Sequence, residues 1–131
     1  MDINRRAGEM TRLMVVDDEI EICDFVKNFF KERDFDVFTA YNGKEALTLA
    51  EMKRPNIILL DIKMPITDGL RTLKEFQKMN LGTKVIMVTA IEDNEKVEEA
   101  IRHGAIGYIT KPISLDQLEQ VVFSAAGRTK I

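Results

Sequence analysis

Acidic residues directly follow two strongly apolar runs of this chain. Asp17 and Asp18 come after the run at 13–16, and Asp61 comes after the run at 57–60. Because a charged aspartate is almost never fully buried without a partner, each should lie at the mouth of a strand. Carboxylates brought together repel one another unless a cation lies between them. With no histidine or cysteine cluster nearby, such oxygen ligands favour a hard ion, and Mg²⁺ fits best.

Two later apolar runs also end on polar residues, Thr89 and Lys111. A hydroxyl group and a lysine ammonium both suit the oxygens of a phosphoryl group. An aspartate can itself be the nucleophile of phosphoryl transfer, which gives an acyl phosphate. If these side chains share one site with the acidic residues, the sequence predicts phosphoryl chemistry there.

Two kinds of apolar pattern alternate along the chain and predict the elements that hold these residues. Short apolar runs bounded by turn residues predict strands, and apolar residues at helical spacing predict amphipathic helices. In the first helix, Ile22, Phe25, Val26 and Phe29 are expected to form the apolar face, with Cys23 half-buried. The expected strands span about 13–16, 35–39, 56–61, 84–89 and 106–110, and the expected helices about 19–33, 43–53, 68–80, 92–102 and 114–126.

Several helix ends carry recognisable signals. Ser114, with Gln117 three residues later, predicts a capping-box start for the last helix. Leu81-Gly82 is expected to end the third helix. In the fourth helix, Ala100 and Ile101 are expected to face inward.

This alternation of strand and helix, with short connections, predicts an α/β fold. Its strands should form one parallel sheet with helices on both faces and right-handed crossovers. Ligands of such sheets bind outside the carboxyl ends of the strands, near the point where the strand order reverses. The polar residues that end the apolar runs are therefore expected to converge on one site.

Length and composition fit one soluble domain. The chain has 131 residues and a net charge of −3, which argues against binding to a nucleic-acid backbone. A single cysteine excludes an internal disulfide, and no apolar run approaches the roughly 20 residues of a membrane span. No secretory signal opens the sequence, so a cytoplasmic location is expected. We expect a disordered leader at 1–10, the domain at 11–126 and a frayed tail at 127–131.

Four motifs, in order and at matching spacing, give the chain a specific family resemblance. They are Val15–Glu19, Asp61–Gly69, Val88–Ala90 and Gly104–Pro112. Over about residues 11–126 the sequence resembles the response-regulator receiver domain, the phosphoacceptor module of two-component signalling. The resemblance implies a doubly wound, flavodoxin-like (βα)5 fold with a five-stranded parallel sheet in the order 2-1-3-4-5.

The resemblance also implies roles for the acidic residues. Asp61 would accept a phosphoryl group from a sensor histidine kinase or a phosphotransfer protein. Mg²⁺ would be coordinated by Asp18, Asp61 and the backbone carbonyl of Lys63, with Asp17 acting mostly through water. Because metal and lysine neutralise the charge that develops in phosphoryl transfer, little further catalytic machinery is needed.

A conformational switch is implied by the remaining motif residues. Thr89 would hydrogen-bond the phosphoryl group, Lys111 would pair with Asp61 or its phosphate, and Tyr108 would move inward as Thr89 moves. The Lys111-Pro112 peptide is expected to be cis, as in most members of the family. Such a domain is a signalling module that catalyses only its own phosphorylation and dephosphorylation.

The family usually signals through the face formed by its fourth helix, fifth strand and fifth helix, which should contact an output partner. Members that dimerise through their last two helices typically carry an acidic pair near the position of Ile106-Gly107 and an arginine in the last helix. This chain lacks both features. A monomer or weak dimer is therefore expected. No direct contact with nucleic acid or membrane is expected.

Lys63 and Ile91 depart from the residues most common at their positions beside the phosphoryl group. We hypothesise that these bulky side chains hinder the attacking water and lengthen the life of the phosphorylated state.

Two other functions compete with this interpretation. A Mg²⁺-dependent phosphatase could use Asp17 as nucleophile and Glu19 as general acid, although such enzymes usually have aspartate at the second position and a longer chain. A degenerate receiver could bind a partner without phosphorylation, although the phosphorylation residues are all present.

Overall fold

The computed structural model of the chain describes residues 10–64, 68–90 and 94–128. The expected leader at 1–10 and the expected tail at 127–131 lie mostly outside these residues, because only residues 10, 127 and 128 of them are described. Strands and helices alternate along the described chain, as predicted. In order they are β1 (Thr11–Val16), α1 (Ile20–Lys31), β2 (Phe35–Ala40), α2 (Gly43–Lys53), β3 (Ile57–Asp61), α3 (Gly69–Met79), β4 (Lys84–Ala90), α4 (Asn94–Arg102), β5 (Gly107–Lys111) and α5 (Leu115–Ala125).

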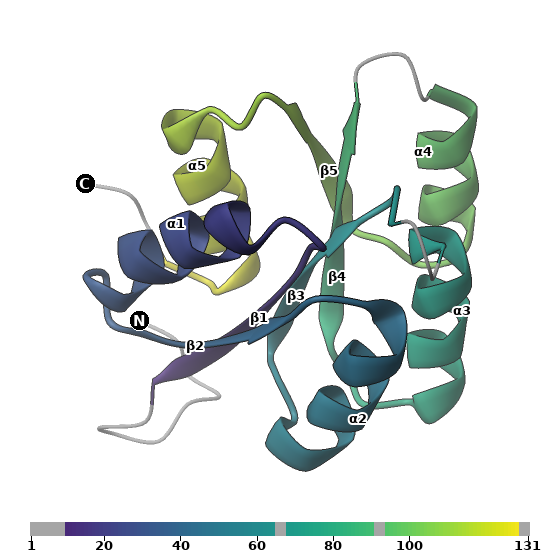
Figure 1. The fold of residues 1–131 in the computed structure, drawn as a ribbon, viewed down its shortest axis with the longest axis horizontal. Coiled ribbons are helices and arrows are strands. Elements are labelled where there is room, and N and C mark those ends of the chain that lie inside the picture. The colour runs from purple at the N-terminus through teal and green to yellow at the C-terminus, as the bar shows by residue number, and fades with distance from the viewer. Residues whose placement is uncertain (1–9, 65–67, 91–93, 129–131) are drawn as a thin grey trace.

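The strands form one parallel five-stranded sheet in the order β2-β1-β3-β4-β5, which confirms the predicted topology (Figure 1). Helices α1 and α5 cover one face of the sheet, and α2, α3 and α4 cover the other (Figure 1). The strand order reverses at β1, because β2 pairs on one side of it and β3 on the other. The carboxyl ends of β1 and β3 therefore meet at the topological switch point, where ligands bind in such folds.

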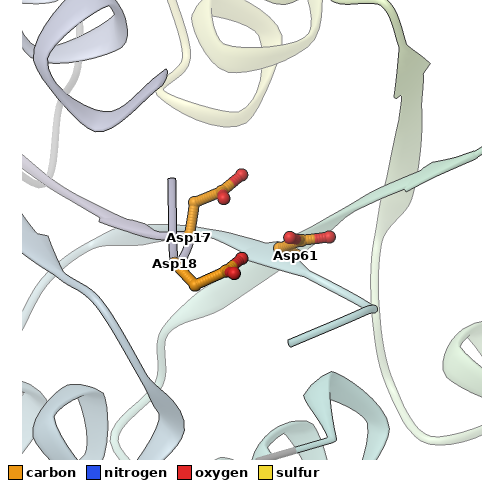
Figure 2. Close-up of side chains that lie close together, drawn as sticks. All are labelled: Asp17, Asp18 and Asp61. Atoms are coloured by element: carbon orange, nitrogen blue, oxygen red, sulfur yellow. The ribbon is translucent and has the colours of Figure 1, made fainter. Parts of the chain in front are cut away.

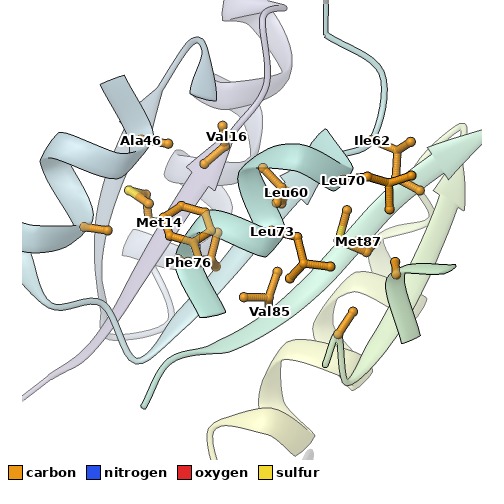
Figure 3. Packing of buried hydrophobic residues seen from close by; sticks show 14 of the residues in the cluster. Met14, Val16, Ala46, Leu60, Ile62, Leu70, Leu73, Phe76, Val85 and Met87 are labelled. Carbon is orange, nitrogen blue, oxygen red and sulfur yellow. The ribbon is translucent and has the colours of Figure 1, made fainter. Parts of the chain in front are cut away.

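The central strands are apolar at consecutive positions because both faces of the sheet are covered. On the face under α2, α3 and α4, Met14 and Leu60 pack with Leu73 and Phe76 of α3 (Figure 3). The intervening residues of β1 and β3, such as Leu59, belong to the core under α1 and α5. Two cores thus fix the central strands, and with them the positions of the residues at the strand ends.

Helix α1 buries most of the predicted face, because Val26 is buried and Ile22 and Phe29 pack against the core, but Phe25 does not. Phe25, expected to be buried, is 48% exposed, whereas Cys23, Val26 and Phe30 are buried. Cys23 and Phe30 lie on the side of this apolar stripe away from Phe25, so the sequence pattern alone does not fix how the helix is rotated against the sheet. Cys23 is fully rather than half buried, and burial, with a smaller contribution from the charge of Asp17, raises the pKa of its thiol to about 12.

Helix α3 is fixed at both ends by local signals. The Asp68 side chain accepts a hydrogen bond of 2.9 Å from the backbone N–H of Leu70, which caps the N-terminus. At the other end Asn80 adopts the left-handed conformation, with φ of 52°. The helix therefore ends at this asparagine, a residue that tolerates positive φ, rather than at the predicted Leu81-Gly82.

The last two helices follow the predictions except at one position. The Ser114 hydroxyl accepts a hydrogen bond from the backbone N–H of Gln117, which confirms the predicted cap of α5. In α4, Ala100 is buried, but Ile101, which was predicted to face inward, is exposed. Within the described residues, no helix has both the length and the apolar character to span a membrane.

Candidate functional site

Asp61 is the last residue of β3 and is only 3% exposed. The backbone continues the sheet hydrogen bonding one residue further, because the N–H of Ile62 donates to the carbonyl of Val88 at 2.9 Å. The Asp61 carboxylate accepts a hydrogen bond of 3.2 Å from the N–H of Lys63. This strand end therefore holds the carboxylate in a fixed direction at the edge of the sheet.

Asp17 and Asp18 follow β1 at the same edge. The N–H of Asp17 donates to the carbonyl of Ala40 at 3.1 Å, so the residue is held against the end of β2. Its carboxylate accepts a 2.9 Å hydrogen bond from the N–H of Glu19 and is buried, whereas Asp18 is exposed. Figure 2 shows the side chains of Asp17, Asp18 and Asp61, which we call the aspartate cluster, close together at this edge.

Lys111, at the end of β5, reaches into the aspartate cluster. Its Nζ lies 3.2 Å from Oδ2 of Asp17, 3.3 Å from Oδ2 of Asp61 and 3.5 Å from Oε1 of Glu19. Burial alone would lower the pKa of this lysine, but the charges of Asp61 and Asp17 outweigh it, so the pKa is raised and the side chain stays protonated. The Lys111-Pro112 peptide is cis, as expected.

Thr89 and Tyr108 occupy neighbouring strands beside the aspartate cluster. Thr89 is buried near the end of β4, and its hydroxyl donates to the carbonyl of Ala90 at 3.2 Å. The register of β4 and β5 places Tyr108 opposite Met87, two residues before Thr89. The tyrosine side chain is 47% exposed, so it lies on the outer surface in this structure.

Burial dominates the electrostatics of the two inner carboxylates. Burial, together with the negative charge of Asp17, raises the pKa of Asp61 to about 6, although Lys111 and the N–H of Lys63 oppose the shift. Burial likewise raises the pKa of Asp17, against the hydrogen bond from Glu19 and the charge of Lys111. One lysine therefore does not fully compensate the two buried carboxylates.

The raised pKa of Asp61 predicts how stability depends on pH. The folded protein keeps the Asp61 proton up to about pH 6, whereas the unfolded chain loses it near pH 3.9. Stability should therefore fall as pH rises between these values, because the folded state binds more protons. Without added metal, Asp61→Asn should raise the free energy of unfolding at pH 7.5 by about 1–3 kcal/mol and flatten this dependence.

Chemical denaturation at several pH values measures this effect. Asp36→Asn on β2 is the matched control, because Asp36 is exposed and its replacement should change stability by less than ~0.5 kcal/mol. Equal free energies of unfolding for the two variants at pH 7.5 would contradict the prediction.

The aspartate cluster fits a divalent metal ion. Each of Asp17, Asp18 and Asp61 offers one carboxylate oxygen, and these oxygens lie within 4.8 Å of one another. Two of the three residues are buried and incompletely neutralised, which a divalent cation would correct. An all-oxygen donor set selects a hard cation such as Mg²⁺.

The structure brings together most of the site residues that the sequence predicts. Asp17, Asp61 and Lys111 are in direct contact, and Asp18 completes the cluster. Of the predicted Lys63 and Ile91 pair, only Lys63 lies within the described residues, and it is exposed. From the sequence, Glu19 is considered as the general acid of an alternative phosphatase, but its contact with Lys111 is missed, because nothing in the local pattern indicates that its side chain reaches the end of β5.

Comparison with known proteins identifies the family. The family model for the response regulator receiver domain matches residues 13–123. The chain belongs to this family. The receiver domain is a signalling module of two-component systems.

Relatives of this receiver domain include both single-domain and longer proteins. It is 36% identical over 118 residues to the chemotaxis protein CheY of Listeria monocytogenes, covering 89% of this chain and 99% of CheY. It is 37% identical over 113 residues to the regulatory protein AtoC of Escherichia coli, covering 86% of this chain but only 24% of AtoC. The chain thus spans about a quarter of that regulator.

Solved structures agree with the observed fold. The receiver domain of the Francisella response regulator 1452 has a TM-score of 0.82 and 37% identity, covering 92% of this chain and 99% of that chain. NtrX from Brucella abortus has a TM-score of 0.85 and 30% identity, covering 91% of this chain and 27% of that chain.

Proposed function

We propose that this receiver domain accepts a phosphoryl group on Asp61 from a sensor histidine kinase or a phosphotransfer protein. The observation that carries the proposal is the buried Asp61 carboxylate at the switch point of the sheet, with Asp17, Asp18 and Lys111 around it. In the transfer, an Asp61 oxygen forms a bond to phosphorus as the bond between phosphorus and the donor's histidine nitrogen breaks. The product is an acyl phosphate on this chain.

The aspartate cluster would hold Mg²⁺ during this transfer. Asp18, Asp61 and the backbone carbonyl of Lys63 are proposed as ligands, with Asp17 acting mostly through water. When bound, the ion supplies positive charge that neutralises the phosphoryl oxygens. The fit of three close carboxylates to a hard cation supports this assignment.

Lys111 and Thr89 would bind the phosphoryl oxygens directly. Lys111 Nζ already lies 3.3 Å from Asp61 Oδ2, so its charge is in place before the transfer begins. The Thr89 hydroxyl, which donates to Ala90 in this structure, would turn to donate to the phosphoryl group. Because Lys111 is preorganised in this way, it lowers the barrier with little reorganisation, whereas Thr89 must first turn.

The same movement of Thr89 would transmit the signal. Phosphorylation adds about −1.5 to −2 charge beside this buried threonine, which is enough to bias a two-state element. Tyr108, exposed in this structure, would move inward as Thr89 is drawn towards the phosphate. The surface formed by α4, β5 and α5 would change as a result.

This surface is proposed as the contact for an output partner. Ile106 and Tyr108 are exposed on it, beside an open pocket of about 660 Å³ between β5 and α5. The names of the relatives, a chemotaxis protein and a regulatory protein, are consistent with either a separate partner or an attached output domain. We propose a monomer or weak dimer in a cytoplasmic setting, without direct binding of nucleic acid or membrane by this domain.

Incubation with Mg²⁺ and acetyl phosphate, followed by measurement of the intact mass, tests the proposed function. A receiver should gain one phosphoryl group. Continuous hydrolysis of assorted phosphate esters would instead indicate a phosphatase that uses Asp17 as nucleophile. A chain with neither activity would be a degenerate receiver.

Lys63 is expected to affect the lifetime of the phosphorylated state. Its long exposed side chain follows Asp61 by two residues and would hinder the water that attacks the acyl phosphate. Lys63→Ala should therefore lose its phosphoryl group several-fold faster than the wild type after the donor is removed. Lys44→Ala, an exposed lysine at the start of α2, is a charge-matched control. Equal decay rates for the two variants would discard the hypothesis.

A further inference from the structure

Glu19 stands at the N-cap of α1 but does not use its side chain as a cap. Among the residues that the structure describes, the Glu19 side chain accepts no capping hydrogen bond from α1. Side chains at this position commonly accept a bond from the first turn of the helix. Here Oε1 of Glu19 lies 3.5 Å from Nζ of Lys111 instead. The carboxylate thus turns away from its own helix and towards the phosphorylation site.

Lys111 is shared between an inner and an outer set of carboxylates. The inner pair, Asp17 and Asp61, is buried, and both residues belong to the proposed metal site. The outer partner, Glu19, has a side chain that is 60% exposed, so it lies towards solvent. Because like charges repel, an ammonium group drawn further between the inner pair would oppose entry of a divalent cation.

From this geometry we propose that Glu19 is a positioning residue, which shares the Lys111 ammonium with Asp17 and Asp61 and so limits how strongly that ammonium competes with a divalent cation for the inner carboxylates. The inference rests on the metal site of the proposed function but not on phosphoryl transfer itself. Without the Glu19 charge, Lys111 should move further towards Asp17 and Asp61 and compete more strongly with the ion.

Calorimetric titration of the full chain with Mg²⁺ tests this role. Glu19→Gln should weaken Mg²⁺ binding ~2- to 5-fold more than Glu21→Gln does, the size of effect typical of a partly exposed ion pair. Glu21 is the matched control because it is an exposed glutamate in the first turn of the same helix. Equal dissociation constants for the two variants would overturn the proposal.

A double-mutant cycle with Lys111 separates positioning from simple loss of charge. In a Lys111→Met background, no ammonium group remains for Glu19 to hold. Glu19→Gln should then weaken Mg²⁺ binding only as much as Glu21→Gln does in the same background. If Glu19→Gln still weakened Mg²⁺ binding more than Glu21→Gln in the Lys111→Met background, by the same factor as in the wild-type background, the proposal would be overturned.

The Mg²⁺ dependence of phosphorylation gives a second measurement that needs no change at Lys111. At limiting Mg²⁺, Glu19→Gln should gain its phosphoryl group from acetyl phosphate more slowly than Glu21→Gln, and the difference should vanish at saturating Mg²⁺. A difference that persists at saturation would overturn the proposal. If the wild type binds Mg²⁺ but never gains a phosphoryl group, the proposed function fails, whereas the titrations still decide the role of Glu19.

Discussion

Asp61→Asn is expected to abolish the gain of a phosphoryl group from acetyl phosphate. The asparagine keeps the shape of the side chain but replaces a nucleophilic carboxylate oxygen with an amide, which forms no acyl phosphate. Intact mass after incubation with Mg²⁺ and the donor measures the result.

Asp68→Asn is the control for this experiment. Asp68 is an exposed aspartate seven residues later, and asparagine caps a helix about as well as aspartate does. This variant should gain one phosphoryl group as the wild type does. A phosphoryl adduct that persists in Asp61→Asn would place the acceptor elsewhere and contradict the central assignment.

The fold could be predicted from the sequence because its strongest signals come from burial on both faces of a sheet. In β1 and β3, alternate residues enter opposite cores, so each strand appears as a continuous apolar run. Once these runs are arranged as parallel strands, their polar ends must converge. Asp17, Asp61 and Lys111 could therefore be placed at one site before any coordinates were known. The strand order came from the family resemblance rather than from the pattern.

The sequence was less informative about the orientation of side chains that could occupy more than one environment. In α1, Phe25 and Cys23 lie on opposite sides of one apolar stripe, and only packing against the sheet buries Cys23 and exposes Phe25. The partner of the Glu19 side chain could not be predicted either. Its acidic side chain suits a helix N-terminus, and its alternative partner, Lys111, becomes a neighbour only when β1 and β5 are both in the sheet.

Gly69→Ala is expected to destabilise the fold by about 2–4 kcal/mol, at or above the upper end of the usual cost of overpacking, because the added carbon would meet backbone atoms. A Cβ atom on Gly69 would lie 2.1 Å from the carbonyl oxygen of Asp61 and 2.7 Å from Cα of Ile62. These are backbone atoms, so no side-chain rotation relieves the clash. The N–H of Gly69 also donates to the carbonyl of Ile62 at 2.9 Å, which holds the start of α3 against this segment.

The clash at Gly69 should therefore disturb the phosphorylation site as well as stability, because relief requires α3 to move away from the end of β3 or the Asp61 backbone to shift. We expect slower phosphoryl uptake by the fraction that remains folded. Gly107→Ala on β5 is the control, because among the described residues no heavy atom outside Gly107 and its two chain neighbours lies within 4 Å of its added carbon. Its stability should stay within ~0.5 kcal/mol of the wild type. Chemical denaturation measures the stability of both variants, and intact mass after incubation with the donor measures their phosphoryl uptake. Equal stability and equal uptake for Gly69→Ala and Gly107→Ala would contradict the prediction that Asp61 depends on this close approach of helix and strand.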